Sequence, residues 1–450
     1  MLNNEYREYD LIKLLHFKKF FAIMINVIEQ QEGVSPDYGL TSFLFFKEEH
    51  MKTEKLWTKN FIIIIIINFF VFLNHLMILS TFPFFISYLG YSDSVSGLCA
   101  TIFSLIAVIC RPFIGWMLDN GKRKVILLIG LCGMALMPMG YLFVYTAFSS
   151  IILAIIFRMA HGCALACSNT STSTIATDII PHSRFSEGMG MLGMATALAT
   201  AIAPSIGEIL MQHSFYLLFF VATLIMIISL ILFSILKTPT IPLTYKPLKI
   251  KELVEKNALP ASCVVLVFLF TYGSLENYIL KFVSKESMIT LSGGLYFTIM
   301  AVMLFLTRIL IGKVADQKGE AIFVYTCNIC MLIALFLIAF IPNNITFLLS
   351  AALSGYAFGG IDPALQSMAV SIAPPQRRGA ANSTFLCAYD MGIGLGGGIA
   401  GFLIDLTGYN HMFAIIAIAN ILSILIYMAI GRKHPSSLTY RLKMQNEKQA

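Results

Sequence analysis

Residues 111–124 read RPFIGWMLDNGKRK, and long apolar segments lie directly before and after them. A carboxylate at Asp119 is followed by Gly121 and three consecutive cations. A related stretch, RILIGKVADQKG, occurs 197 residues later at residues 308–319, and both share the frame Arg-x3-Gly-x3-Asp. A polar turn between apolar segments that recurs at this distance predicts a chain of two similar halves.

The composition identifies the class of protein. Of the 450 residues, 58% are hydrophobic and 12% are charged, and the mean hydropathy is +0.80. Soluble domains are about 45–50% apolar and about 25% charged. The apolar segments here are long and continuous, as helices that cross a bilayer require, whereas strands of a membrane barrel would be short and alternating. We therefore expect an all-α integral membrane protein.

Twelve membrane spans are expected from Phe61 onward. Their predicted boundaries are 61–89, 95–118, 124–146, 148–176, 188–211, 215–236, 260–284, 291–315, 321–342, 345–372, 379–405 and 410–431. The first six form an N-terminal half at 61–236 and the last six a C-terminal half at 260–431. A basic, proline-containing linker at 237–259, partly helical near Lys249–Glu255, divides them.

The two ends of the chain are more polar. Residues 1–60 are interpreted as a cytoplasmic extension, in which Leu11 to Ile28 could form an amphipathic helix on the membrane surface. Met51 begins a sequence typical of a bacterial membrane protein, so either Met51 is the physiological start or residues 1–50 are loosely attached. Residues 432–450 are expected to form a cytoplasmic tail.

The net charge of +7 is interpreted as a topology signal and not as a nucleic-acid site, because the cations gather in short loops. Loops after even-numbered spans carry nearly all of these cations, while those after odd-numbered spans carry Lys285, and Lys281 if it lies outside its span. Cytoplasmic loops are enriched in Lys and Arg. Both termini and the linker are therefore expected in the cytoplasm, with the protein in the inner or plasma membrane.

This orientation makes a testable prediction. Cysteines introduced at Phe148 and Thr407 should react with an impermeant thiol reagent from outside the cell, and one at Thr244 only from inside, because the first two lie at a span end and in a loop on the outer side and the third lies in the cytoplasmic linker. Labelling of intact cells and of inverted vesicles measures this, and the reverse pattern would contradict the predicted orientation.

Other functional classes lack their sequence signatures. The nine cysteines lie in apolar segments, and Cys327 and Cys330 form a CxxC without a second pair, so no disulfide or metal site is expected. The sequence contains no GxxxxGK[ST] motif, so ATP is not the expected energy source. It also contains no HExxH motif, and we expect neither an enzyme nor a cofactor.

Twelve spans, a basic central linker and polar turns after spans 2 and 8 resemble the major facilitator superfamily over residues 60–432. The loop after span 2 matches the family's signature at Gly115, Asp119, Lys122 and Arg123, although it is one residue shorter. The second copy retains Gly312 and Asp316. The resemblance implies that these residues form a latch that helps to close the cytoplasmic side. The alternative is that their charges only set the topology.

Two further motifs point to the direction of transport. Span 4 reads Arg158-x-x-His161-Gly162, where the family has Arg-x-x-Gln-Gly. Span 5 retains Gly190, Pro204 and Gly207 of a motif that exporters of the family carry, with alanine at two other glycine positions. This similarity favours efflux over uptake.

In this superfamily spans 1, 4, 7 and 10 line the substrate cavity, which implies candidate residues for substrate contact or coupling. On these spans lie Asn74, His75, Arg158, His161, Tyr272, Glu276, Asn277, Tyr356 and Asp362, and Asp390 lies on the glycine-rich span 11. Arg158 sits deep in its span, where a charge usually faces a cavity or a partner, with snorkelling as the alternative. Arg111 and Arg308 lie nearer span ends, so both are expected to snorkel. His75 and His161 fit either a structural or a proton-carrying role.

Glu276 is the expected proton-coupling residue, because it is the one acid well inside spans 1, 4 and 7 and burial favours the protonated form of a carboxyl group. Asp362 and Asp390 are its rivals. The sequence thus predicts a monomeric secondary transporter, driven by a proton gradient, that exports a small amphipathic or drug-like molecule. Uptake, or efflux of a sugar or other metabolite, is the alternative within transport, and a membrane receptor or sensor is the alternative in another class.

Overall fold

The computed structural model describes residues 55–181, 184–237, 247, 254–318, 320–371 and 378–435, with the side chains of 119, 185–187, 309–318, 371, 378 and 379 not described. The predicted surface helix Leu11–Ile28, the start at Met51 and most of the predicted linker helix lie outside these residues.

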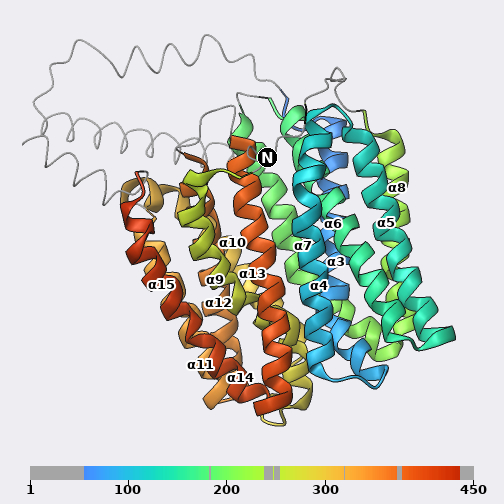
Figure 1. Ribbon diagram of the computed structural model, residues 1–450, viewed down its shortest axis with the longest axis vertical. Helices are drawn as coiled ribbons and strands as arrows, with labels where there is room; N and C mark the ends of the chain where they lie inside the picture. The colour runs from blue at the N-terminus through green and yellow to red at the C-terminus, as the bar shows by residue number, and fades with distance from the viewer. Residues whose placement is uncertain are drawn as a thin grey trace, which may run out of the picture. The chain divides into compact units, whose positions relative to one another are not determined.

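From Leu56 onward the described chain is helical and falls into two groups of helices (Figure 1). The N-terminal group comprises α3 (Lys59–Tyr88), α4 (Asp93–Asp119), α5 (Arg123–Phe143), α6 (Ile151–Ile179), α7 (Phe185–His213) and α8 (Phe215–Ile235). The C-terminal group comprises α9 (Leu259–Lys285), α10 (Gly293–Lys318), α11 (Ala321–Phe340), α12 (Asn344–Ser371), α13 (Arg378–Thr407), α14 (Tyr409–Ala417) and α15 (Ala419–Ala429).

The predicted all-α membrane fold is confirmed. Within the described residues, eleven helical segments are long and apolar enough to cross a membrane, and the apolar part of α10, Gly293–Arg308, is a shorter twelfth. Two spans depart from a simple helix. Span 3 continues from α5 into a π-helix, Val144–Phe148, and span 12 is interrupted at Ile418, where a hydrogen bond from the Ile418 amide to the Ile415 carbonyl tightens the turn.

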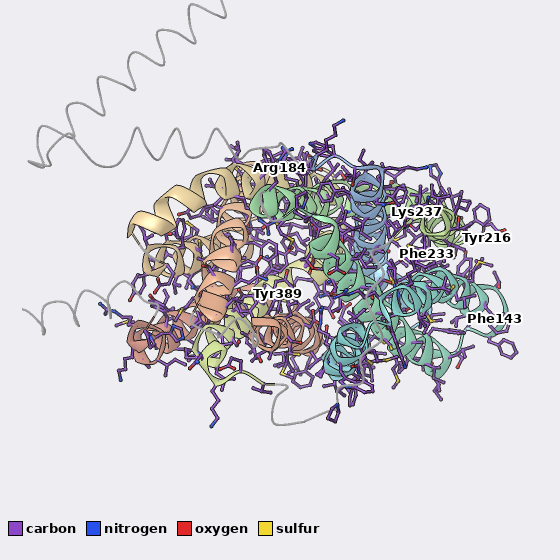
Figure 2. All side chains as sticks on the ribbon, turned by 90° about the horizontal axis from the view of Figure 1, so that it is seen from above. Phe143, Arg184, Tyr216, Phe233, Lys237 and Tyr389 are labelled. Atoms are coloured by element: carbon purple, nitrogen blue, oxygen red, sulfur yellow. The ribbon has the colours of Figure 1, made fainter. Side chains whose placement is uncertain are left out.

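Apolar side chains cover the outer faces of the helices. Phe143 and Tyr216, for example, lie at the outer edge of the N-terminal group and are about half exposed (Figure 2). The polar side chains Asn68, Arg158 and Asn328 are instead buried among the helices. This distribution suits a surface in contact with lipid tails and an interior that holds the costly polar groups.

The two groups meet mainly along two helix pairs, α4 with α13 and α7 with α10 (Figure 1), with further contact between α3 and α9. Glycines allow close approach in the first pair, since a Cβ atom at Gly97 would lie only 2.7 Å from the carbonyl oxygens of Gly397 and Gly398. In the second pair, a Cβ atom at Gly294 would lie 2.6 Å from the Cα atom of Ser205. Glycines therefore permit close helix contact in both pairs.

This packing predicts that two glycines of α4 differ in their tolerance of a methyl group. Gly97→Ala should lower the midpoint temperature of thermal unfolding, because the new Cβ meets backbone atoms of α13 that have no rotamer to change. Gly115→Ala should not lower it, because no described atom of a neighbouring element lies within 4 Å of that site and alanine is the better helix former by about 1 kcal/mol. Thermal unfolding of both purified variants tests this, and an equal loss in both would contradict the proposed packing.

Candidate functional site

Arg158 of α6 is fully buried inside the N-terminal group. Its guanidinium carbon lies 4.4 Å from the ring centre of Phe82 on α3 and 4.2 Å from that of Phe103 on α4. A desolvated cation over an aromatic face gains about 2 kcal/mol, which offsets only part of the cost of burying the charge. Arg158 therefore does not snorkel to an interface but stays within the bundle.

Two histidines lie beside this guanidinium. His75 of α3 stacks on Phe103 with ring centres 5.2 Å apart, and the His75 and His161 rings lie 6.5 Å apart. The Tyr141 hydroxyl lies 3.2 Å from Nδ1 of His161. The structure thus brings together three predicted residues, His75, Arg158 and His161, and adds an aromatic surround that the sequence did not indicate. We call these three residues the Arg158 cluster.

Several buried polar atoms of the Arg158 cluster have no hydrogen-bond partner within the described part of the chain. They are the three guanidinium nitrogens of Arg158, Nδ1 of His75 and Nε2 of His161. Buried polar groups in native proteins are nearly always hydrogen-bonded, so each exception calls for an explanation such as water, an ion or a ligand.

Glu276 occupies a separate position in the C-terminal group. It is buried on α9 and accepts a hydrogen bond of 3.3 Å from the hydroxyl of Tyr272, one helical turn earlier. The Tyr272 ring stacks on Phe358 of α12 at 4.2 Å. No ion pair involves Glu276 among the described side chains, and Arg158 makes no hydrogen bond to it.

The two rival carboxylates are each paired with an arginine. Asp362 of α12 lies 3.4 Å from Arg308 of α10, within the C-terminal group. Asp390 of α13 pairs with Arg111 of α4 across the two groups, and Nη2 of Arg111 donates to Oδ1 at 3.0 Å. The expectation that Arg111 snorkels is therefore wrong, because its side chain is only 5% exposed and its charge is matched by Asp390. Arg308, one third exposed, is also held by a carboxylate and not simply extended to an interface.

Three further predicted residues make local contacts. Asn74 donates from Nδ2 to the carbonyl of Ala222 on α8 at 2.8 Å, and Asn277 donates to the carbonyl of Gly273 within its own helix at 2.7 Å. The Tyr356 hydroxyl lies 3.0 Å from the hydroxyl of Thr326 on α11. Tyr356 therefore points towards α11, while Tyr272 stacks on Phe358.

The predicted latch is only partly described. Lys122 is exposed, and Arg123 forms an ion pair of 2.8 Å with Asp178 of α6, within the N-terminal group. A Cβ atom at Gly115 would meet no atom within 4 Å among the described residues. The side chains of Asp119 and Asp316, and the surroundings of Gly312, lie outside the described residues.

The predicted exporter motif lies on α7. Pro204 lies within the helix, and Gly190 has no neighbour that a Cβ atom would meet. A Cβ atom at Gly207 would lie 2.9 Å from the carbonyl oxygen of Met77, so this glycine allows α7 to pack closely on α3.

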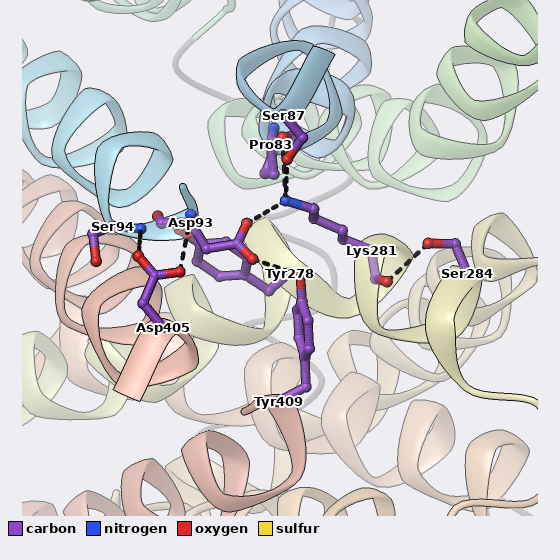
Figure 3. Close-up of polar contacts among 9 residues, drawn as sticks. All are labelled: Pro83, Ser87, Asp93, Ser94, Tyr278, Lys281, Ser284, Asp405 and Tyr409. Carbon is purple, nitrogen blue, oxygen red and sulfur yellow. Dashed lines mark hydrogen bonds and ion pairs between the residues drawn. The ribbon is translucent and has the colours of Figure 1, made fainter. Parts of the chain in front are cut away.

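The sequence missed a polar network that joins the two groups at the α3–α4 turn (Figure 3). Asp93, at the start of α4, forms a buried ion pair with Lys281 of α9. Its other carboxylate oxygen accepts a 2.8 Å hydrogen bond from the hydroxyl of Tyr409, and its carbonyl accepts one of 3.0 Å from Tyr278. Lys281 also donates to the hydroxyl of Ser87 on α3. The sequence treated Lys281 only as a topology signal.

Two carboxylates at the same end cap helices of the opposite group. Asp405, near the end of α13, accepts from the amides of Asp93 at 3.2 Å and Ser94 at 2.8 Å, at the start of α4. Glu208, near the end of α7, accepts from the Gly294 amide at 2.7 Å, at the start of α10. A carboxylate at a helix N-terminus satisfies free amides and the helix dipole.

These reciprocal caps follow the internal repeat. Glu208 and Asp405 are 197 residues apart, the same offset as Arg111 and Arg308. That common offset was the signal in the sequence that could have located them. One end of the structure is therefore held together by a buried ion pair and by a symmetric pair of helix caps.

Two groups of membrane-spanning helices, joined along two helix pairs and holding ionisable groups inside each, define a transport protein of the two-bundle class. The family model of the Major Facilitator Superfamily matches residues 64–340 and 263–446. The chain belongs to this superfamily, whose transporters carry small molecules across membranes.

Comparison with known proteins supports the assignment to this superfamily. An uncharacterised MFS-type transporter of Methanocaldococcus jannaschii is 26% identical over 380 residues, covering 76% of this chain and 91% of that protein. A staphylopine export protein of Staphylococcus aureus is 23% identical, covering 73% of this chain and 85% of the relative. The same fold occurs in a human organic anion transporter, with a TM-score of 0.62 and 18% identity over 82% of this chain and 98% of that one. It also occurs in a nucleoside transporter, with a TM-score of 0.66 and 15% identity over 83% of this chain and 100% of that one.

Proposed function

We propose that this transporter exports a small amphipathic molecule in exchange for protons, and that Glu276 carries the proton. The observation behind the proposal is that Glu276 is buried with a tyrosine hydroxyl as its partner, whereas Asp93, Asp362 and Asp390 are each paired with a cation.

The groups that surround each carboxyl group determine how readily it can exchange a proton. Burial favours the neutral form of a carboxyl group, while an adjacent cation favours the ionised form. The cation of an ion pair therefore opposes protonation of its carboxylate, which makes a paired carboxylate the weaker candidate for a proton carrier. Glu276 has no such cation among its described neighbours, so gaining or losing one proton changes the net charge of its site. That change is what coupling to substrate binding requires.

Export is supported by the relative that is named an export protein and by the small residues of α7. The stacked aromatic rings of Tyr272 and Phe358 beside Glu276 offer apolar surface suited to an amphipathic substrate. In an alternating-access cycle, the end joined by Asp93, Lys281 and the reciprocal caps would have to separate while the opposite end closes.

Flux measurements in inverted membrane vesicles test this proposal. A panel of amphipathic compounds is offered with and without an imposed proton gradient that is acidic inside the vesicle. Accumulation that depends on the gradient supports proton-coupled export. Gradient-driven movement in the opposite direction would identify an importer, and transport that is indifferent to the gradient would contradict proton coupling.

A further inference from the structure

The charge of Arg158 has no counter-ion in the described part of the chain. A guanidinium remains protonated in proteins, so this charge persists in the buried state. The buried carboxylate Asp93 and the half-buried carboxylates Asp362 and Asp390 are engaged by Lys281, Arg308 and Arg111 instead. Burying an unpaired charge costs several kcal/mol, and folded proteins retain one where it serves a partner that arrives from outside.

The geometry around Arg158 leaves its hydrogen-bonding edges available. Phe82 and Phe103 engage the guanidinium through cation–π contacts, in which a ring face and not a hydrogen-bond acceptor meets the cation. The N–H groups lie in the guanidinium plane, and none of Nε, Nη1 and Nη2 makes a hydrogen bond of good geometry to a described residue, although the Tyr141 hydroxyl interacts with the guanidinium. Two parallel donors in one plane match the two oxygens of a carboxylate.

The neighbouring imidazoles can add a further donor. If the Tyr141 hydroxyl donates to Nδ1 of His161, the proton of this imidazole lies on Nε2, which is buried and has no partner in the described chain. Nδ1 of His75 is a second ring nitrogen without a partner. Neutral imidazoles suit the site, since further positive charge would repel the guanidinium.

We propose that the Arg158 cluster binds the carboxylate of an organic anion, and that this anion belongs to the substrate class of the transporter. The inference rests on the exporter function proposed above and specifies its substrate. Water could satisfy the N–H groups but would leave the buried charge unmatched, whereas a carboxylate does both. The aromatic rings of Phe82, Phe103 and Tyr141 supply apolar surface for the rest of the molecule, which favours an organic over an inorganic anion.

Thermal unfolding of the purified full-length protein tests this without any transport. The probes are acetate, benzoate and 1-naphthylacetate, each compared with its neutral amide and with sodium chloride at equal ionic strength. A ligand that binds the folded state raises the unfolding midpoint. We expect the carboxylates to raise it, increasingly with the size of the apolar part, and the amides and chloride to leave it unchanged.

Variants assign the effect to the residue. Arg158→Gln should abolish the shift, and Arg158→Lys, which keeps the charge but lacks the planar pair of donors, should reduce it. If Arg158→Gln does not fold, Arg158→Lys still tests whether the guanidinium of Arg158 binds the carboxylate. Lys285→Gln is the matched control, since Lys285 also lies over an aromatic ring, 4.9 Å from the centre of Tyr409, but outside the cluster. It should retain the full shift.

Several results would overturn the proposal. The first is an equal shift with chloride, which would indicate a site for inorganic anions. The second is an unchanged shift in both Arg158 variants. The third is no shift with any of the three carboxylates. The unfolding assay uses no proton gradient, so it measures binding at Arg158 separately from proton coupling. A failure of proton coupling in the flux assay would thus be distinguished from a failure of anion binding.

Discussion

Replacing Glu276 with glutamine is expected to reduce proton-driven transport to the background of vesicles without the protein, while substrate exchange across the membrane continues. Glutamine has nearly the same shape and can still accept the hydrogen bond from Tyr272, so the packing around α9 is preserved. It cannot gain or lose a proton in the cycle. Gradient-driven flux and counterflow of the same substrate, measured in one vesicle preparation, separate the two activities.

Matched variants test whether the loss of proton-driven flux is specific to Glu276. Glu286→Gln removes a carboxylate just beyond the end of the same helix and should leave proton-driven flux intact. Asp362→Asn and Asp390→Asn remove carboxylates that are already paired with arginines, and each should weaken those pairs without abolishing coupling. Normal proton-driven flux in Glu276→Gln, with its loss in either aspartate variant, would move the coupling role to that aspartate.

Removing one partner of the Asp93–Lys281 ion pair should produce the largest loss of stability. Both side chains are buried, so Asp93→Asn leaves the ammonium of Lys281 without its counter-ion. Breaking a buried pair in this way costs about 3–5 kcal/mol. Because the pair joins α4 to α9, the single variant should also separate the two groups at this end. A lower midpoint temperature of thermal unfolding, and faster thiol labelling of a cysteine at buried Ala100 in a cysteine-free background, measure the two effects.

The double variant Asp93→Asn, Lys281→Met is the control for this interaction. It removes both charges, so its unfolding midpoint should recover most of the loss seen in either single variant. The accessibility of the cysteine at position 100 would report whether the helix caps from Asp405 and Glu208 suffice to hold this end together. Losses that simply add in the double variant would show that the ion pair contributes no coupling between the groups.

The class of fold could be predicted from the sequence because membrane-spanning helices can be recognised by the length and the hydropathy of their apolar segments. The twelve expected spans correspond to the observed helices, and the recurring Arg-x3-Gly-x3-Asp frame falls at the ends of α4 and α10, as the repeat required. The bilayer imposes this regularity, since each span must satisfy its own backbone within the hydrocarbon. The interruption at Ile418 and the π-helix after Phe143 were not predicted, because no proline or glycine marks them.

The sequence by itself also selected chemically relevant residues, since an ionisable group within an apolar span is costly wherever it lies. Arg158, Glu276 and Asp390 were found in this way. Only the tertiary structure decided their partners. It paired Asp390 with Arg111, left Glu276 with a tyrosine and surrounded Arg158 with aromatic rings. Residues 279 positions apart meet in the first of these pairs, and no periodicity within either helix encodes that contact.

The contacts that hold the two halves together were likewise a matter of tertiary structure. Asp93 and Lys281 lie near span ends, where a charge costs little and the sequence offers no reason to look for a partner. Packing of α13 against both α4 and α9 brings Asp93 to Asp405 and Lys281, and removal from water then makes the ion pair energetically important. The sequence determined the helices and their buried charges, whereas the fold determined which charges meet, because helix packing sets the distances on which electrostatic free energy depends.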